Sequence, residues 1–351
     1  MLDRLLEKFS RDLGIDLGTA NTLVYDREKG IVINEPTVVA LNTRTDELIA
    51  VGNKARDMVG KTPPHIITTR PLVKGIISDF EVTEKMLKHF LDKVHENHHT
   101  FYPRPRVVIG VPLDLTEVER KAVEDAVLGA GARTVYLVEE PMAAAIGARL
   151  PIKESVGTMI VDIGGGVTEI AIISLGGVVN WRAIPIAGDE MNRSISQYAR
   201  DVFNLLLGEK SAEEIKMKLG SAIELPQPLE GTMRGRDLMS GLPKEINVSD
   251  SQIREALSRC IRQIVESVKA TLEVTPPELV ADIYERGIVM TGGGALLKGL
   301  DKLIAKAAEI PVRVIDDPLT CVVRGTGIIL EDPDLLREIR LPSASTIGAM
   351  N

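Results

Sequence analysis

The sequence predicts an α/β fold of two related lobes, and three observations support this prediction. A chain of 351 residues is too long for one compact core and suits two domains. Strand-like apolar runs alternate with helix-like segments, as in layered α/β folds. The phrase "GIDLGTANTLVY" (14–25) returns as "MIVDIGGGVTEIAI" (159–172), with an Asp, an apolar residue and a Gly before a Thr and a strand-like run. A repeat at this long spacing indicates a duplicated domain.

The first copy of the repeat predicts a β-hairpin that binds phosphate. Gly18 lacks a side chain at the turn, so backbone N–H groups can approach an anion before the next strand begins. Asp16 stands where the hairpin begins to turn. A tight turn with an Asp for local hydrogen bonds explains a single copy equally well. Two copies favour a ligand.

Two turn-rich regions predict smaller insertions into this framework. The first covers about 34–69 and the second about 183–249. We therefore expect lobe I at 1–145 and lobe II at 146–319. The segment at about 320–345 is expected to return to lobe I.

The segment "YLVEEPMAAAIGA" predicts a strand that ends at Val138 and a helix with Pro141 in its first turn. Glu139 and Glu140 lie at the junction. Acidic residues there suit the helix dipole, which is a sufficient structural explanation. A carboxylate beside a triphosphate can also orient a water molecule for in-line attack. We assign this role to Glu140, with Glu139 as the alternative.

The second copy of the repeat supplies another glycine turn, at Gly164, Gly165 and Gly166, and another aspartate, Asp162. If two domains close on one ligand, Asp16 and Asp162 approach one cation. Mg²⁺ prefers oxygen ligands and keeps several waters, so carboxylates beside a polyphosphate are its usual setting. We expect both aspartates to bind Mg²⁺ largely through water.

Two further segments suit the nucleoside part of a ligand. In "SAEEIKMKLG", Glu213 and Lys216 share a helix face and can reach a ribose hydroxyl together, although a surface ion pair is the alternative. In "GIVMTGGGALLKGL", a strand leads through Gly292, Gly293 and Gly294 into a helix, which admits a nucleotide without side-chain collision.

Two helices are predicted to serve packing. "TEVERKAVEDAVLGAGA" begins with Thr116 and Glu119 at capping-box spacing. "SDSQIREALSRCIRQIVESVKATLEVTPPELV" is long and amphipathic, with a stop at Pro276 and five apolar residues in register: Ile253, Leu257, Ile261, Ile264 and Val268.

Composition and charge exclude several classes of protein. The net charge is −8 and no polybasic tract occurs, which argues against nucleic acid as a partner. Cys260 and Cys321 lack the short spacing of a zinc or redox motif and are expected to be core thiols in a reducing compartment. No apolar stretch reaches bilayer length and the N-terminus has no apolar h-region, so a secreted or membrane-spanning protein is not expected.

Taken together, these motifs resemble the actin, sugar kinase and heat-shock chaperone superfamily of ATPases, and more closely its bacterial actins. The resemblance covers nearly the whole chain in ordered blocks: "DLGTANTLVY", "GKTP", "RPLVKGIISDF", "PRVVIGVP", "VEEPMAAAIGA", "VDIGGGVTEIAI", "IAGDEMN", "TPPELVADI" and "RGIVMTGGGALLKGLD". It implies an actin-like ATPase fold with two ribonuclease-H-like lobes, ATP and Mg²⁺ as cofactors, and head-to-tail filaments. It also implies that the filaments maintain rod shape by organising cell-wall synthesis, with cell-wall elongation proteins as partners.

The resemblance also implies roles for individual residues. One phosphate loop comprises Gly18, Thr19, Ala20 and Asn21, and the other comprises Gly164, Gly165 and Gly166. The ribose contacts are Glu213 and Lys216, and the adenosine-side loop is Gly292, Gly293, Gly294 and Ala295. Glu140 and Thr168 are the implied catalytic residues. The family usually reads Gly-Gly-Gly-Thr-Thr, whereas Val167 precedes Thr168 here, which leaves the rate of hydrolysis open. Eukaryotic actins also carry Val at this position.

The N-terminal "MLDRLLEKF" places four apolar residues on one side of a helix: Leu2, Leu5, Leu6 and Phe9. Such a helix can lie in a membrane interface or dock on its own domain. Its similarity to the family's membrane anchor favours the membrane. Phe101 and Tyr102 of "TFYPRP" are a second apolar candidate, with a buried loop as the alternative. We therefore expect a cytoplasmic protein at the inner face of the cytoplasmic membrane.

Three other functions fit parts of the pattern. A small-molecule kinase of the same superfamily is the main one, but no acceptor-site motif is evident. A chaperone ATPase would need a substrate domain after the nucleotide lobes, and the chain ends soon after "RGTGIIL". A filament that does not hydrolyse ATP is compatible with Val167.

Overall fold

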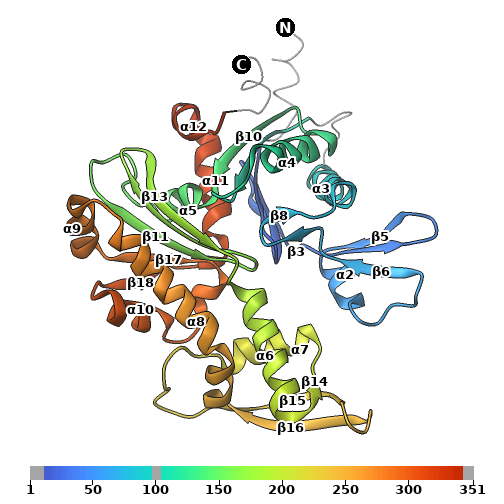
Figure 1. The fold of residues 1–351 in the computed structure, drawn as a ribbon. Coiled ribbons are helices and arrows are strands. Elements are labelled where there is room, and N and C mark those ends of the chain that lie inside the picture. The colour runs from blue at the N-terminus through green and yellow to red at the C-terminus, as the bar shows by residue number, and fades with distance from the viewer. Residues whose placement is uncertain (1–11, 97–103, 343–351) are drawn as a thin grey trace. The chain divides into compact units, whose positions relative to one another are not determined.

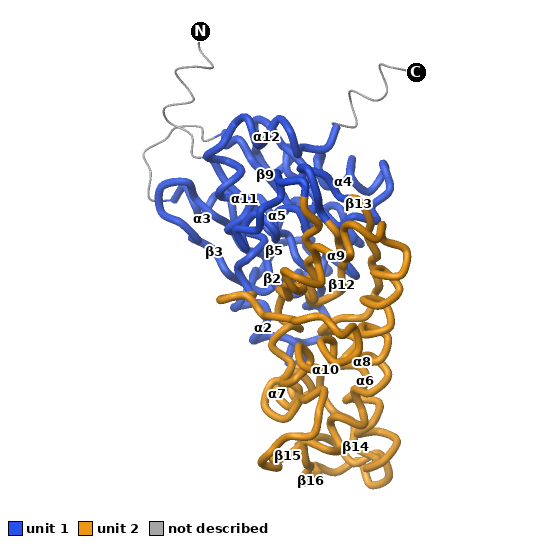
Figure 2. Tube along the Cα trace, turned by 90° about the vertical axis from the view of Figure 1, so that its left-hand side faces the viewer, with its two compact units in different colours: residues 1–155, 173–178, 319–351 blue, residues 156–172, 179–318 orange. Residues whose placement is uncertain are grey.

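The computed structural model describes residues 12–96 and 104–342 as two compact units (Figure 2). Unit 1 comprises Met1–Ser155, Ile173–Val178 and Leu319–Asn351. Unit 2 comprises Val156–Ile172 and Val179–Pro318. Each unit has a core cluster of buried apolar side chains.

The main sheets of the chain share one strand order (Figure 1). The first sheet has the order β10-β9-β1-β2-β3 and the second has the order β18-β17-β11-β12-β13. The first contains β1 Leu13–Leu17, β2 Asn21–Asp26, β3 Gly30–Pro36, β9 Arg106–Val111 and β10 Thr134–Glu139. The second contains β11 Thr158–Ile163, β12 Thr168–Ser174, β13 Gly177–Ile184, β17 Ile288–Thr291 and β18 Val312–Val314. In each sheet, three strands that are consecutive in the chain lie side by side, and two later strands extend the sheet next to the first of the three. The sequence repeat therefore corresponds to a duplicated sheet.

Burial explains why the central strands read as nearly continuous apolar runs. Every residue of β11 and β12 is buried, and β1 is buried except for the half-buried Asp16. Strands covered on both faces lose the polar alternation of a half-exposed sheet. Asp16 and Asp162 are acidic residues within such strands, as is the buried Glu169 of β12.

Helix α4 (Glu117–Gly129) begins as the sequence predicts, and α8 (Asp250–Glu273) begins with a cap of the same kind that was not predicted. Thr116 and Glu119 form a complete capping box, and Ser249 and Gln252 form a second one. Each box provides hydrogen-bond partners for N–H groups that the first helical turn leaves unpaired. The predicted apolar face of α8 is buried in the core of unit 2: Ile253, Leu257, Ile261, Ile264 and Val268.

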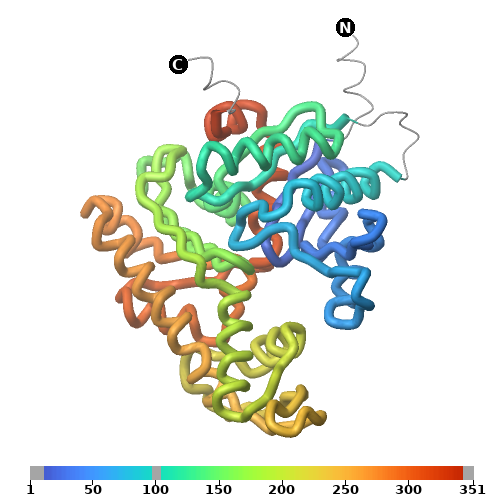
Figure 3. Tube along the Cα trace, turned by 45° about the vertical axis from the view of Figure 1, so that its right-hand side comes forward, coloured from blue at the N-terminus to red at the C-terminus, as the bar shows by residue number. Residues whose placement is uncertain are grey.

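Helix α11 (Cys321–Glu331), from the last stretch of the chain, packs on α5 (Glu140–Gly147), β1 and β9 in unit 1 (Figure 3). A Cβ at Gly325 would overlap the Ala143 carbonyl, and one at Gly147 would overlap the Cys321 carbonyl. Glycine therefore allows the two helix backbones to touch. The other helices in the described part of unit 1 are α2 Asn53–Met58, α3 Phe80–His95 and α12 Pro333–Ile339.

Each unit also carries a three-stranded sheet. In unit 1 it is formed by β4 Val39–Asn42, β5 Glu47–Val51 and β6 Ile66–Thr69; the hairpin β7 Leu72–Val73 and β8 Ile76–Ile77 follows. In unit 2 it is formed by β14 Leu205–Leu206, β15 Glu230–Asp237 and β16 Pro243–Ser249. The remaining helices of unit 2 are α6 Gly188–Phe203, α7 Glu209–Leu219, α9 Pro277–Arg286, η1 Gly293–Leu296 and α10 Leu300–Ala308; η2 is Pro318–Thr320.

Candidate nucleotide-binding loops

In unit 1, the turn after β1 is too tight for a side chain at Gly18. Leu17 and Thr22 are the last paired residues of the β1–β2 hairpin, so residues 18–21 close it. A Cβ at Gly18 would lie 2.8 Å from the Asn21 carbonyl oxygen and 3.6 Å from Oδ1 of Asp16. The Asp16 carboxylate therefore lies beside the turn, as the sequence predicts for a phosphate loop with an adjacent cation ligand.

Thr37 holds this turn from the β3–β4 connection. Its hydroxyl donates to the Gly18 carbonyl at 2.7 Å and lies 2.9 Å from the Thr22 hydroxyl oxygen. Its backbone N–H donates to the Ala20 carbonyl at 3.0 Å. Thr22 and Thr37 are fully buried, so these bonds are shielded from water. Sequence reasoning missed Thr37, because nothing in its neighbourhood indicates a contact with residues near Gly18.

Thr19 holds the same turn from the β7–β8 hairpin. Its hydroxyl accepts a hydrogen bond from the Gly75 N–H at 2.8 Å. Lys74 and Gly75 form that hairpin's turn with φ of 53° and 78°, a left-handed conformation that is rare for Lys. The turn at 18–21 is thus held by two segments that follow it in the sequence.

Glu140 lies at the same strand ends as Asp16. Gly110 of β9 pairs with Asp16 of β1 and with Val138 of β10. A Cβ at Gly110 would meet Cγ of Glu140 at 3.2 Å, so the Glu140 side chain covers this glycine. Burial raises the pKa of the neighbouring Glu139, and the charge of Arg120 opposes that rise. Both glutamates are half-buried.

In unit 2, the turn at residues 164–167 is held by the start of α6. The Gly164 and Gly165 carbonyls accept hydrogen bonds from the N–H groups of Gly188 (3.1 Å) and Asp189 (2.8 Å). Thr168 is fully buried, and its hydroxyl donates to the Ile186 carbonyl at 2.6 Å. This hydrogen bond therefore helps to hold the loop in place. The catalytic role predicted for Thr168 stays a prediction.

Asp162 is a buried carboxylate beside the third glycine cluster. It pairs in register with Thr291 of β17, and burial raises its pKa to about 7. A Cβ at Gly292 would overlap Oδ1 of Asp162, and one at Gly294 would overlap the Ile163 side chain. Gly292 also has φ of 80°, so the conformation and the close contact both require glycine.

A magnesium ion fits the chemistry of this carboxylate. A cation favours the charged form that burial disfavours, and the oxygen donor suits Mg²⁺. Within residues 12–96 and 104–342, no cluster of three or more metal-ligating side chains occurs. Asp162 is therefore not part of such a cluster among these residues.

Glu213 and Lys216 lie one turn apart on α7, both half-buried. Nζ of Lys216 donates to the Gly188 carbonyl at 3.0 Å, next to the Gly164 loop. Ala295 is buried in the core of unit 2, so its backbone is what it can offer a ligand. The structure thus brings Lys216, Gly164 and Gly188 together, and separately brings Asp162 and Gly292 together.

The membrane candidates Leu2, Leu5, Leu6, Phe9, Phe101 and Tyr102 lie outside the described residues. Their role stays a prediction. Among the residues with a described structure, we find no helix with the length and apolarity needed to traverse a bilayer.

Comparison with known proteins places this chain in a family. The family model described as "MreB/Mbl protein" matches residues 10–338. The cell shape-determining protein Mbl of Bacillus subtilis is 48% identical over 333 residues, which are 95% of this chain and 99% of Mbl. Two solved structures are similar in fold. MreB5 of Spiroplasma citri bound to ADP superposes with a TM-score of 0.88 at 38% identity, covering 94% of this chain and 98% of that one. The MamK double helical filament has a TM-score of 0.77 at 22% identity, covering 92% of this chain and 99% of that one. The similarity to MamK is evidence for the fold alone. The chain has an actin-like fold and belongs to the MreB/Mbl family.

Proposed function

We propose that this chain is an actin-like, ATP-dependent protein that assembles into filaments and maintains cell shape. The observation that carries this proposal is the duplicated hairpin, in which each unit has a glycine turn with an aspartate next to it. Membership in a family that includes a cell shape-determining protein supports the same function. A small-molecule kinase is not favoured, because nothing in that family's description or in Mbl's name indicates a phosphate acceptor.

ATP with Mg²⁺ is the proposed ligand. The turns at 18–21 and 164–166 would receive the phosphates, Glu213 and Lys216 the ribose, and residues 292–295 the adenosine side. Asp16 and Asp162 would hold Mg²⁺ largely through water. The ion, when bound, neutralises the charge of the phosphate oxygens. Binding of ADP by MreB5, a relative with the same fold, supports a nucleotide at these loops.

Hydrolysis is proposed to depend on Glu140. Its carboxylate lies at the carboxyl ends of β1 and β9, beside the residue that pairs with Asp16. From there it can accept a proton from a water molecule and orient that water for attack. Glu139 remains the alternative, since the higher pKa that burial gives it makes it a better proton acceptor but less often ionised.

The experiment that tests this function compares two variants in one assay of pelleting and phosphate release with magnesium-ATP. Asp162→Ala should abolish assembly. Glu140→Ala should still assemble but release phosphate at least about a hundredfold more slowly, the usual contribution of a general base. Glu117→Ala, an exposed carboxylate in the first turn of α4, is the matched control and should change neither measurement. If the unmodified protein does not assemble with any nucleotide, the filament function is wrong.

The proposed place of action is the inner face of the cytoplasmic membrane, together with cell-wall elongation proteins. This part rests on the apolar face of residues 2–9 and on Phe101 and Tyr102. Liposomes should increase the pelleted fraction of the unmodified protein. A protein in which Leu5, Leu6 and Phe9 are changed to Ser should assemble equally well with and without lipid. Equal pelleting of both proteins with liposomes would contradict a membrane role for this segment.

A further inference from the structure

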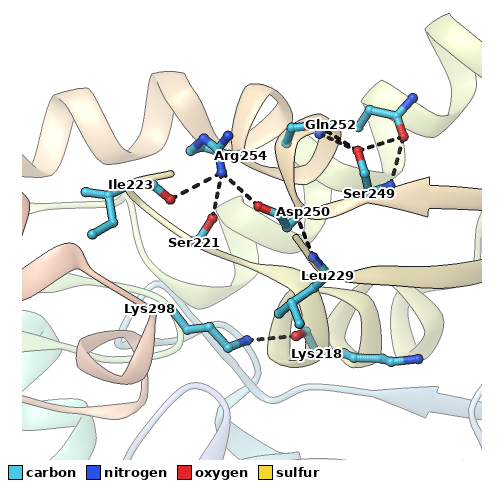
Figure 4. Close-up of polar contacts among 10 residues, drawn as sticks. Lys218, Ser221, Ile223, Leu229, Ser249, Asp250, Gln252, Arg254 and Lys298 are labelled. Atoms are coloured by element: carbon cyan, nitrogen blue, oxygen red, sulfur yellow. Dashed lines mark hydrogen bonds and ion pairs between the residues drawn. The ribbon is translucent and has the colours of Figure 1, made fainter. Parts of the chain in front are cut away.

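Residues 220–229 connect α7 to β15 largely without regular secondary structure, and a charged pair on α8 holds them in place (Figure 4). The pair is Asp250 and Arg254, which lie one helical turn apart. Neither residue belongs to the loops assigned to ATP. The pair lies in unit 2, as do those nucleoside-side loops.

Asp250 fixes the far end of this connection. The residue is 4% exposed, and Oδ1 of its carboxylate accepts the Leu229 N–H at 2.9 Å. The Asp250 N–H donates to the Leu229 carbonyl at 2.9 Å, so the two residues are doubly linked. Oδ2 accepts Nη1 of Arg254 at 3.0 Å. These bonds, the Leu229 N–H first, lower the pKa of Asp250, so it is ionised at neutral pH.

Arg254 fixes the near end. The same nitrogen, Nη1, also donates to the Ser221 hydroxyl and to the Ile223 carbonyl, both at 3.2 Å. One guanidinium nitrogen thus donates hydrogen bonds to a carboxylate, a hydroxyl and a carbonyl. Because Nη1 carries two hydrogens for these three acceptors, at least one N–H is shared between two of them.

The segment at 221–223 is in turn attached to the chain that follows the glycine cluster. Ser221 forms a parallel bridge with Lys298, and the Ala222 N–H donates to the Lys298 carbonyl at 2.8 Å. A Cβ at Gly299 would overlap the Ile223 side chain. Residues 221–223 and 298–299 therefore pack directly against each other.

Lys298 completes the connection to α7. Its Nζ donates to the Lys218 carbonyl at 2.7 Å, in the last turn of the helix that carries Glu213 and Lys216. A Cβ at Gly220 would meet Leu297 at 2.8 Å. The C-terminus of α7 is thus hydrogen-bonded to Lys298, next to the residues that Arg254 contacts, Ser221 and Ile223.

We infer that Asp250 and Arg254 are positioning residues for the nucleoside half of the nucleotide site. They fix the separation between α7, with its proposed ribose contacts, and the 292–295 loop on the adenosine side. This inference rests on the proposed function. It predicts that loss of the pair weakens contacts to adenosine while contacts to the phosphates, which the turns at 18–21 and 164–166 would supply, are retained.

The test compares two ligands, magnesium-ATP and magnesium-tripolyphosphate, by titration calorimetry. Arg254→Met keeps the apolar stem and removes the guanidinium; it should weaken ATP binding about tenfold or more and change tripolyphosphate binding by less than about twofold. Arg254→Lys should restore part of the lost ATP affinity. The matched control is Arg234→Met, which removes the exposed Arg234–Glu245 pair of β15 and β16 and should leave both affinities unchanged.

Each result has one meaning. Equal loss of both affinities in Arg254→Met, or no loss of either, overturns the positioning role and leaves the proposed function intact. If the unmodified protein binds neither ligand, the proposed function is wrong and the inference falls with it. If Arg254→Met does not fold, Ser221→Ala replaces it, because this change removes one of the three acceptors and the same selective loss of ATP affinity is expected.

Discussion

At the scale of single residues, Asp162 illustrates a conflict between burial and charge. It lies one residue before the end of a buried strand, and burial raises its pKa from 3.8 to about 7. A carboxylate in such a place destabilises the protein unless it is protonated or paired with a cation. This cost is a reason to expect a ligand at Asp162, since a structural aspartate could be replaced by an uncharged residue.

The pH dependence of stability should reveal this conflict. Because the folded protein holds the Asp162 proton more tightly than the unfolded chain, stability falls as pH rises from about 4 to about 7, by up to about 4 kcal/mol. Without metal or nucleotide, Asp162→Asn should therefore raise the free energy of unfolding at pH 8 and have little effect near pH 4. Urea unfolding at both pH values measures this. If Asp162→Asn is less stable than the unmodified protein at pH 8, then the surrounding groups already stabilise the charged carboxylate of Asp162.

Thr37 makes a second residue-scale prediction. Thr37→Val removes a buried donor from the Gly18 carbonyl, so it should cost about 1–3 kcal/mol of stability and weaken ATP binding. The matched control is Thr83→Val, which also removes a buried hydroxyl donor. Thr83 lies on α3, and its hydroxyl donates to the carbonyl of Asp79, the N-cap of that helix. The control should leave ATP affinity unchanged. Equal ATP affinity in Thr37→Val and the unmodified protein would mean that the turn keeps its shape without this bond.

The same residues show what sequence can predict. Asp16, Asp162 and the glycine turns were predictable because local spacing and repetition encode them. The partners of Thr19 and Thr37 were not, because the hydrogen bonds from Gly75 and to Gly18 join separate elements. Such bonds depend on how strands pack, and packing leaves no local pattern.

At the scale of elements, the capping boxes of α4 and α8 were predictable for the same reason. Ser or Thr three residues before Glu or Gln is a local signal with a local cause. The close approach of α5 and α11 is different, because it joins Gly147 and Gly325 with carbonyls on the opposite helix. Those glycines look like ordinary weak points of a helix in the sequence.

The helix pair gives a stability prediction. Gly325→Ala should destabilise the protein by about 2 kcal/mol or more, since its methyl group would overlap the Ala143 carbonyl and push the helices apart. Gly208→Ala is the control, because nothing lies within 4 Å of a Cβ there and φ is −74°; it should cost less than about 1 kcal/mol. Urea unfolding followed by circular dichroism distinguishes them. Similar stability for both variants would contradict the tight contact.

At the scale of the whole molecule, the sequence repeat and the sheet repeat agree. The sequence indicated two related lobes, and the structure has two sheets with the same strand order. The repeat was visible because both hairpins keep an Asp and a glycine turn. The strands that extend the sheets, such as β10 and β18, share no comparable motif, so their equivalence was not evident from the sequence.

Ligand binding should stabilise the molecule as a whole. A ligand that binds only the folded state adds about 2.7 kcal/mol when its concentration is a hundred times Kd. Magnesium-ATP should therefore raise Tm in a concentration-dependent manner, whereas Asp162→Ala should show no rise. Thermal unfolding with ATP, with Mg²⁺ and with both measures this. A rise of equal size in the variant would place the bound nucleotide away from Asp162.

Unit 1 is assembled from three separate stretches of chain, and α11, in the last of them, packs against β1, one of its first strands. During synthesis the ribosome delivers the sheet of unit 1 long before α11, and all of unit 2 emerges between them. The apolar surface that α11 covers must therefore stay open while about half of the chain is still being made, a stage at which exposed apolar surface favours aggregation. A nascent chain of this protein is thus expected to need chaperone protection until residues 321–331 have left the ribosome.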